Sequence, residues 1–172
     1  MEKIKAHLQG ETVFSADSEA YSLYEKSRFG EINEDKVQYS LSEAIFLHQN
    51  NKLDIFFANR KLSKEEIFEK CRKIDKKIMI KYSVFKNLRE KGYIVKSALK
   101  FGADFRVYDK GSRLGDDHAR WIVFCEHESN KLSWTDFAAK NRVAHSTKKK
   151  LLIGIVDEES DVSYYEVNWI KP

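Results

Sequence analysis

The sequence predicts an α/β or α+β fold of two domains, a small N-terminal α/β domain followed by a domain built on a five-stranded mixed sheet. One observation behind this prediction is a change of period at Gly92. Apolar residues recur at helical spacing before it and alternate as in strands after it. The other observation is the order of the elements after Gly92, which the pattern predicts as βββαββ. We place the domain boundary within the long helical region, which gives domains 1–77 and 78–172.

The first half carries start and stop signals for short elements. A hairpin is expected around Gly10, and the helix after it should end at Gly30, because glycine suits a left-handed cap position. Segments 40–43 (SLSE) and 63–66 (SKEE) have the form of a capping box, in which serine and glutamate satisfy the first free N–H groups of a helix. The second box opens a long helical pattern that ends only at Gly92.

The second half predicts the larger sheet. Strand-like runs lie on both sides of a helix, at 93–99, 104–109, 118–126, 149–157 and 162–170. The helix spans 134–145, and its apolar spacing predicts that Trp134, Phe137 and Ala138 face inward. We also expect Trp169, on the last strand, to lie in the core, with stacking on a nucleic-acid base as the alternative.

Composition narrows the class of protein. Hydrophobic residues at 42% and charged residues at 34% over 172 positions are typical of a globular protein with a strongly hydrated surface. No apolar run approaches the roughly 20 residues of a membrane helix, and the N-terminus does not resemble a signal peptide. Cys71 and Cys125 each lie in an apolar pattern and are expected to be buried free thiols. These features predict a cytoplasmic protein with no membrane partner.

Charge is distributed unevenly along the chain. The net charge of +4 permits RNA binding but does not demonstrate it. The segment 140–150 (KNRVAHSTKKK) is basic, and the segment 157–161 (DEESD) is a compact acidic loop between two apolar strands. An acidic loop suits a basic partner surface better than RNA, and a second copy of this chain could supply that surface.

Tyr108, His118 and Lys149 are the strongest candidates for chemistry. A group that accepts a proton, a group that donates one near neutral pH and a fixed cation are the parts needed to cleave RNA without a metal. We find no convincing metal-binding carboxylate set around them, so no metal or other cofactor is expected. A phenol with a pKa near 10 is protonated at pH 7, so as a base a tyrosine needs either a nearby cation that lowers its pKa or a concerted proton transfer.

Each of these residues also has a structural interpretation. Taken alone, Tyr108 would be a half-buried sheet aromatic, His118 a surface residue at a loop, and Lys149 an ordinary surface lysine. Strand alternation places Lys148 and Lys150 on the opposite face from Lys149. His145 is the rival histidine, but its place at a helix end suggests that it caps free carbonyls.

The local sequences GYIVKSALKFGADFRVYDKG, DDHARWIVF and RVAHSTKKKLLIGIVD resemble those of the archaeal tRNA-splicing endonucleases. The resemblance covers most of the chain and is strongest from Tyr93 onward. It implies that Tyr108, His118 and Lys149 are the catalytic residues. It also implies metal-free cleavage of precursor tRNA at both splice sites of a bulge–helix–bulge, by attack of a 2′-hydroxyl, leaving 2′,3′-cyclic phosphate and 5′-hydroxyl ends.

The resemblance extends to RNA binding and assembly. Arg142 is the candidate for one arm of a grip on a bulged base, with a helix-surface arginine as the alternative, and Lys148 stands where relatives can have arginine. The acidic loop is expected to dock a neighbouring subunit in a homotetramer, with a dimer as the alternative. The residues that we expect to dock are Asp157, Glu158, Glu159 and Asp161.

Two other functions stay open from the sequence. A metal-dependent nuclease of the restriction-enzyme type needs an aspartate and a Glu-x-Lys-like pair on neighbouring strands, and we find no convincing set. A non-catalytic RNA-binding or structural subunit of a heteromeric endonuclease is the second, against which the intact Tyr108, His118 and Lys149 argue.

Overall fold

A computed structural model describes residues 3–113, 115 and 117–172 of the chain. Contacts between residues divide it into two compact units, one up to Tyr82 and the other Ser83–Pro172. The division falls inside helix α4 (Ile78–Glu90). The domain boundary expected at residue 78 stays a prediction. Among the described residues, no helix is both long and apolar enough to cross a membrane.

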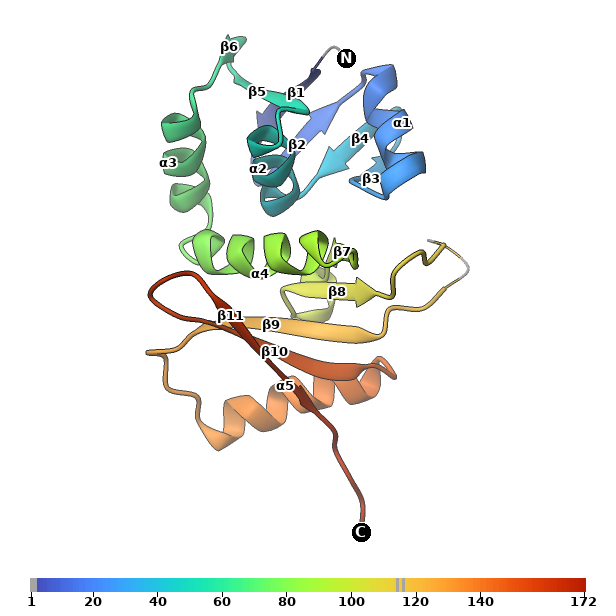
Figure 1. Cartoon of the computed structure of the whole chain (residues 1–172), viewed down its shortest axis with the longest axis vertical. Helices are drawn as coiled ribbons and strands as arrows, with labels where there is room; N and C mark the ends of the chain where they lie inside the picture. The colour runs from blue at the N-terminus through green and yellow to red at the C-terminus, as the bar shows by residue number, and fades with distance from the viewer. Residues whose placement is uncertain (1–2, 114, 116) are drawn as a thin grey trace. The chain divides into compact units, whose positions relative to one another are not determined.

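The N-terminal unit is a six-stranded sheet with three helices preceding α4, in the strand order β3-β4-β2-β1-β5-β6 (Figure 1). Strands β1 and β5 are parallel, and the other neighbours are antiparallel. The elements are β1 (Ile4–Gln9), β2 (Thr12–Ser15), α1 (Ser18–Ser27), β3 (Glu31–Asn33), β4 (Lys36–Tyr39), α2 (Leu41–Gln49), β5 (Leu53–Phe57), β6 (Arg60–Lys61) and α3 (Lys64–Ile74).

Both predicted capping boxes are present, at the starts of α2 and α3. The end predicted for α1 is wrong, because Arg28 and not Gly30 takes the left-handed cap position, with φ of 59°. Gly30 serves a different purpose. Its backbone N–H donates to Glu43, and a Cβ at Gly30 would lie 2.4 Å from a methyl of Val37. The hairpin of β3 and β4, which the sequence did not reveal, therefore packs tightly against this glycine.

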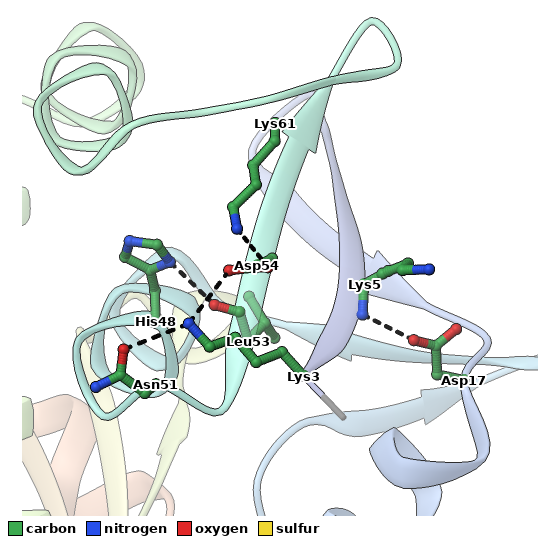
Figure 2. Close-up of polar contacts among 8 residues, drawn as sticks. All are labelled: Lys3, Lys5, Asp17, His48, Asn51, Leu53, Asp54 and Lys61. Atoms are coloured by element: carbon green, nitrogen blue, oxygen red, sulfur yellow. Dashed lines mark hydrogen bonds and ion pairs between the residues drawn. The ribbon is translucent and has the colours of Figure 1, made fainter. Parts of the chain in front are cut away.

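Polar contacts connect β5 of the N-terminal sheet to its neighbours (Figure 2). The Asp54 carboxylate on β5 lies 2.6 Å from the Lys61 ammonium on β6 and 3.9 Å from that of Lys3. His48 donates from Nδ1 to the carbonyl oxygen of Leu53 at 2.9 Å, which fixes the end of α2 against β5. These polar groups serve the fold of this unit.

The long helix expected up to Gly92 is two helices, α3 and α4. Asp75 ends the first one in an extended conformation, with φ of −133° and ψ of 108°. Its carboxylate accepts from the N–H of Lys77, and its carbonyl accepts from the N–H of Ile78. An aspartate that competes for backbone N–H groups in this way interrupts a helical pattern without glycine or proline.

The C-terminal unit confirms the predicted five-stranded mixed sheet, in the order β11-β10-β9-β8-β7. Strands β9 and β10 are parallel, and the other neighbours are antiparallel. The elements are β7 (Ile94–Ser97), the short helix η1 (Leu99–Phe101), β8 (Phe105–Tyr108), β9 (Trp121–His127), α5 (Trp134–Ser146), β10 (Lys150–Val156) and β11 (Val162–Val167).

Different helices cover the two faces of this sheet. On one face, Ala144 of α5 packs with Ile122 and Leu151 in the main apolar cluster. On the other face, a Cβ at Gly154 would lie 3.0 Å from Val84 of α4, and Tyr164 donates to Asn87 at 3.0 Å. Because side chains alternate along a strand, neighbouring residues of β10 face different helices.

Two tryptophans expected in the core lie at the surface. Trp134 is 84% exposed and Trp169 is 62% exposed. Trp134 is the first residue of α5, where its ring contacts Phe137 edge-on at 5.7 Å. Trp169 lies beyond the last strand, which ends at Val167. Helical and strand periodicity predict a buried face only while the partner element continues alongside. The cysteines Cys71 and Cys125 are buried free thiols, as expected.

Candidate active site

The sheet topology brings the three candidate catalytic residues to one end of the C-terminal sheet. Tyr108 is the last residue of β8, His118 lies shortly before β9, and Lys149 directly precedes β10. Strand β8 runs antiparallel to β9, which runs parallel to β10, so the end of β8 meets the starts of the other two. The Arg120 N–H donates to Val107, and the Lys150 N–H donates to Arg120, which joins these ends.

Tyr108 is held firmly at this end. Only 8% of its surface is exposed, and it forms a small apolar cluster with Ile94 and Ala119. Ile94 is its partner across β7 and β8. Ala119 is the neighbour of His118 in sequence, so this cluster anchors the backbone next to the histidine.

His118 is exposed and follows a turn. The Asp117 carboxylate accepts from the Arg113 N–H at 2.6 Å, and the Asp117 N–H donates to the Arg113 carbonyl. These two bonds close the turn just before the histidine. An exposed imidazole at a sheet end is accessible to a ligand from solvent.

Lys149 is positioned by the end of α5. The N–H of Lys148 donates to His145 at 3.0 Å, and the N–H of Lys149 donates to Ala144 at 2.9 Å. This is the Schellman pattern of helix termination. Its left-handed residue is Lys148, with φ of 55°, where glycine is the usual choice. The half-buried Lys149 side chain donates from Nζ to the Thr147 carbonyl at 3.2 Å.

A pocket of about 120 Å³ lies beside Lys149 on the α5 face. The His145 ring contacts Trp169 edge-on, with ring centroids 4.7 Å apart. The His145 ring thus forms an aromatic wall of the pocket. The carbonyls at the end of α5, which His145 was expected to cap, accept from the backbone N–H groups of Thr147, Lys148 and Lys149. The residues lining the pocket are Asn141, Ala144, His145, Lys149, Lys150, Leu151, Val167, Asn168 and Trp169.

The sequence singled out Lys149 and His145 of this pocket, but not Asn141 or Asn168. Asn141 and His145 stand four residues apart on α5, on the same side of the helix as Ala144. That spacing was the available signal. Arg142 is exposed on α5 and is not part of the described lining. Lys148 is exposed and precedes β10, so strand alternation does not govern its direction.

The acidic loop is a tight turn closed by its own first residue. Asp157 accepts on Oδ1 from the N–H groups of Glu159 and Asp161, both at 2.9 Å. The Asp157 N–H donates to the Asp161 carbonyl. Glu158, Glu159 and Asp161 are exposed, whereas Asp157 is partly buried. The outward charge of the loop therefore comes from the last three of these carboxylates.

The carboxylates of the described residues do not gather into a metal site. Within residues 3–113, 115 and 117–172, no group of three or more His, Cys, Asp or Glu side chains is arranged to hold a metal ion.

Comparison with known proteins defines the class. Residues 78–164 match the model of the tRNA intron endonuclease, catalytic C-terminal domain, and residues 4–68 match that of the N-terminal domain. The tRNA-splicing endonuclease of Thermococcus onnurineus is 42% identical over 99% of this chain and 98% of its own length. That of Methanothermobacter thermautotrophicus is 37% identical over 99% of both chains.

These matches identify an endonuclease, and the fold agrees with both domain models. The tRNA-splicing endonuclease of Thermococcus kodakarensis is a further relative, 44% identical over 96% of this chain and 97% of its own. The chain belongs to the tRNA intron endonuclease family.

Proposed function

We propose that this protein cuts precursor tRNA at both splice sites of a bulge–helix–bulge, by a metal-independent reaction that makes it an RNA lyase. The observation that carries the proposal is the gathering of Tyr108, His118 and Lys149 at one end of the C-terminal sheet. Membership of the family supports it. The hydrated, charged composition supports a cytoplasmic location for this work.

The reaction follows from how charge develops at the phosphorus. Tyr108 in its phenolate form takes the proton of the 2′-hydroxyl before the cut and becomes a neutral phenol, and the 2′-oxygen bonds to the adjacent phosphorus. Lys149 stabilises the negative charge on the non-bridging oxygens. In comparable sites such a donor lowers the activation free energy by about 3 kcal/mol. The bond from phosphorus to the 5′-oxygen breaks, and His118 gives that oxygen its proton. The products are a 2′,3′-cyclic phosphate and a 5′-hydroxyl.

The geometry of Lys149 suits this role. Its ammonium donates to the Thr147 carbonyl, which holds it at the sheet end before any phosphate arrives. A phosphoryl oxygen is a stronger acceptor for an ammonium than a neutral carbonyl, because the bond joins two charged groups. Substrate binding is therefore expected to transfer Lys149 from Thr147 to the scissile phosphate.

The first test is cleavage of a bulge–helix–bulge RNA by the purified chain in EDTA, with identification of the product ends. Cyclic phosphate and 5′-hydroxyl ends, lost in His118→Ala, are the expected result. Cleavage that requires Mg²⁺ would move the protein to the metal-dependent nucleases. No cleavage with or without Mg²⁺ would instead favour a subunit that needs a catalytic partner.

The pocket beside Lys149 suits an unstacked bulge base, which we place against the ring of Trp169. Arg142 is exposed on α5 outside the described lining, and we propose it as the second arm. Stacking of a base on an aromatic side chain contributes about 1–3 kcal/mol. Trp169→Ala should therefore weaken binding of an uncleavable 2′-deoxy substrate by about 5- to 100-fold. Trp134→Ala is the matched control, because Trp134 is also exposed but begins α5 instead of lining the pocket. Equal loss in both variants would contradict this placement.

The family implies two cuts by two active sites, so we propose a homotetramer that docks through the acidic loop, with a dimer as the alternative. Glu158, Glu159 and Asp161 supply the exposed charge. Replacing both Glu158 and Glu159 with lysine should shift the assembly to smaller species in sizing profiles at moderate salt. Asp157→Asn is the control, because the amide oxygen can still close the turn; the proposal fails if the lysine variant assembles normally.

A further inference from the structure

A set of side chains links strands β9, β10 and β11 close to Lys149. Lys150 begins β10 and donates from Nζ to Oε1 of Glu166 on β11 at 2.8 Å. The other oxygen of Glu166, Oε2, accepts from Nε1 of Trp121 on β9, also at 2.8 Å. One carboxylate therefore links β9, β10 and β11, using both of its oxygens.

This linkage lies on the α4 face of the sheet. Lys150 and Gly154 are both on β10 and an even number of residues apart, so they face the same way. Gly154 faces Val84 of α4, whereas Leu151 packs in the cluster with Ala144 of α5. Lys149 lines the pocket on the α5 face. The Lys150 ammonium is thus held on the α4 face, although Lys150 also contributes to the lining of the pocket beside Lys149.

The same linkage continues to the ends of β8 and β9. The guanidinium of Arg120 lies 4.3 Å from the ring centroid of Trp121, and it donates to Asp109 at 3.2 Å. Asp109 directly follows Tyr108, and Arg120 comes two residues after His118. The clamp, as we call Asp109, Arg120, Trp121, Lys150 and Glu166, thus contains a residue within two positions of each of Tyr108, His118 and Lys149.

We propose that Glu166 is a positioning residue, which sets the relative placement of Tyr108, His118 and Lys149 through the clamp without touching the RNA. This inference rests on the catalytic roles proposed above. Small errors in the placement of reacting groups are costly, since a displacement of about 1 Å can cost about 100-fold in rate. An edge strand such as β11 has only one neighbour in the sheet, so a side-chain link across to β9 is an effective way to fix its register.

Electrostatics make Glu166 suited to this task. Its hydrogen bond to Lys150, and then that to Trp121, hold the pKa of the carboxyl below its usual range. The group is consequently ionised at neutral pH and can accept from both partners at once. Loss of the carboxylate would leave the Trp121 N–H and the Lys150 ammonium without their shared acceptor.

The test uses single-turnover cleavage at saturating enzyme, together with the Kd for the 2′-deoxy substrate. Glu166→Ala is expected to slow cleavage by about 10- to 100-fold, while the Kd stays within about twofold. Glu166→Gln should lose less, because its amide oxygen can still accept from Trp121. Glu90→Gln is the matched control, since it removes an exposed carboxylate of the same unit that pairs with Lys86. A merely structural role would lower the melting temperature without this split between rate and affinity.

A charge swap separates positioning from a direct contact with RNA. Lys150→Glu and Glu166→Lys should each slow cleavage, and the double variant should recover most of the rate, because the pair forms again with reversed charges. A double variant as slow as the slower single variant would overturn the proposal and indicate that Lys150 itself contacts the substrate. Wild-type rates in Glu166→Ala and Glu166→Gln would also overturn it.

Failure of the catalytic assignment is recognised separately. Lys149→Ala is run beside these variants, and full activity in it would refute the proposed role of Lys149 whatever Glu166 does. Loss of activity in Lys149→Ala, with normal rates in the Glu166 variants, would leave the proposed function intact and reject the clamp alone.

Discussion

The two sheets of this protein use their polar side chains in different ways. In the N-terminal unit, Glu43 and Glu66 satisfy backbone N–H groups at helix starts, and Asp54 ties two strands together. In the C-terminal unit, His118 is exposed shortly before β9, and the Lys149 ammonium donates to a backbone carbonyl. Changes in the first unit should therefore cost stability, and changes at the sheet end of the second should cost rate.

The largest expected effect compares two tyrosines that each lose one hydroxyl. Tyr108→Phe should slow cleavage by about 100- to 10,000-fold, the usual contribution of a general base, with little change in stability. Tyr39→Phe should leave the rate unchanged, because the Tyr39 hydroxyl is buried in the N-terminal unit without a hydrogen-bond partner in the described structure. Single-turnover cleavage and thermal unfolding measure both. Slow cleavage by Tyr39→Phe would contradict the expected difference between the two tyrosines.

The next effect is on stability. Gly30→Ala should destabilise the N-terminal unit by about 2–4 kcal/mol, because its Cβ would lie 2.4 Å from Val37 and φ is +77°. Gly10→Ala also has a positive φ of +60° but meets open space, so a loss of only about 1 kcal/mol is expected. Urea unfolding measures the difference. Below its unfolding temperature, Gly30→Ala should cleave RNA at the wild-type rate. A folded Gly30→Ala protein that cleaves slowly would contradict the expectation that changes in the N-terminal unit affect stability and not rate.

A third comparison concerns Lys148, where fold and function make opposite demands. A lysine in the left-handed position of a Schellman motif is less favourable than glycine. Lys148→Gly should therefore leave the free energy of unfolding unchanged or raise it by up to about 1 kcal/mol. The same variant should bind the 2′-deoxy RNA several-fold more weakly, and the salt dependence of binding should be less steep by about one charge. Unchanged binding would reject Lys148 as an RNA contact.

The smallest expected effect is a pH dependence in the N-terminal unit. The hydrogen bond from Arg60, with that from the Ser63 backbone, lowers the pKa of Glu66 to about 2. A pKa lowered by folding contributes stability that is present above the unfolded value of about 4.3 and is lost as pH falls toward 2. Glu66→Gln can keep the capping box but not the charge. The melting temperatures of wild type and Glu66→Gln should therefore converge from pH 5 to pH 2. A constant difference would exclude the ionised pair as the cause.

Local signals in the chain predicted much of this architecture. Capping boxes, the change of period at Gly92 and the apolar strands depend on neighbours in sequence. The capping boxes located the starts of α2 and α3, and the other two signals located the elements of the C-terminal sheet. The break at Asp75 was missed, since an aspartate ends a helix only when its side chain turns back on the next N–H groups. The β3–β4 hairpin was missed because its strands are short and its turn residue Glu34 takes a positive φ without being glycine.

The sequence by itself determined the element types, the buried thiols and the identities of Tyr108, His118 and Lys149 as candidates, because motif and periodicity are properties of adjacent residues. Only the tertiary structure decided which surfaces lie against one another. The parallel pairing of β9 and β10 brought the three candidates to one sheet end. The packing of the C-terminal unit left Trp134 and Trp169 in solvent and joined Lys150, Trp121 and Glu166 on the α4 face. Such contacts join residues far apart in the chain, 45 residues between Trp121 and Glu166 and 77 between Asn87 and Tyr164, so no local pattern encodes them.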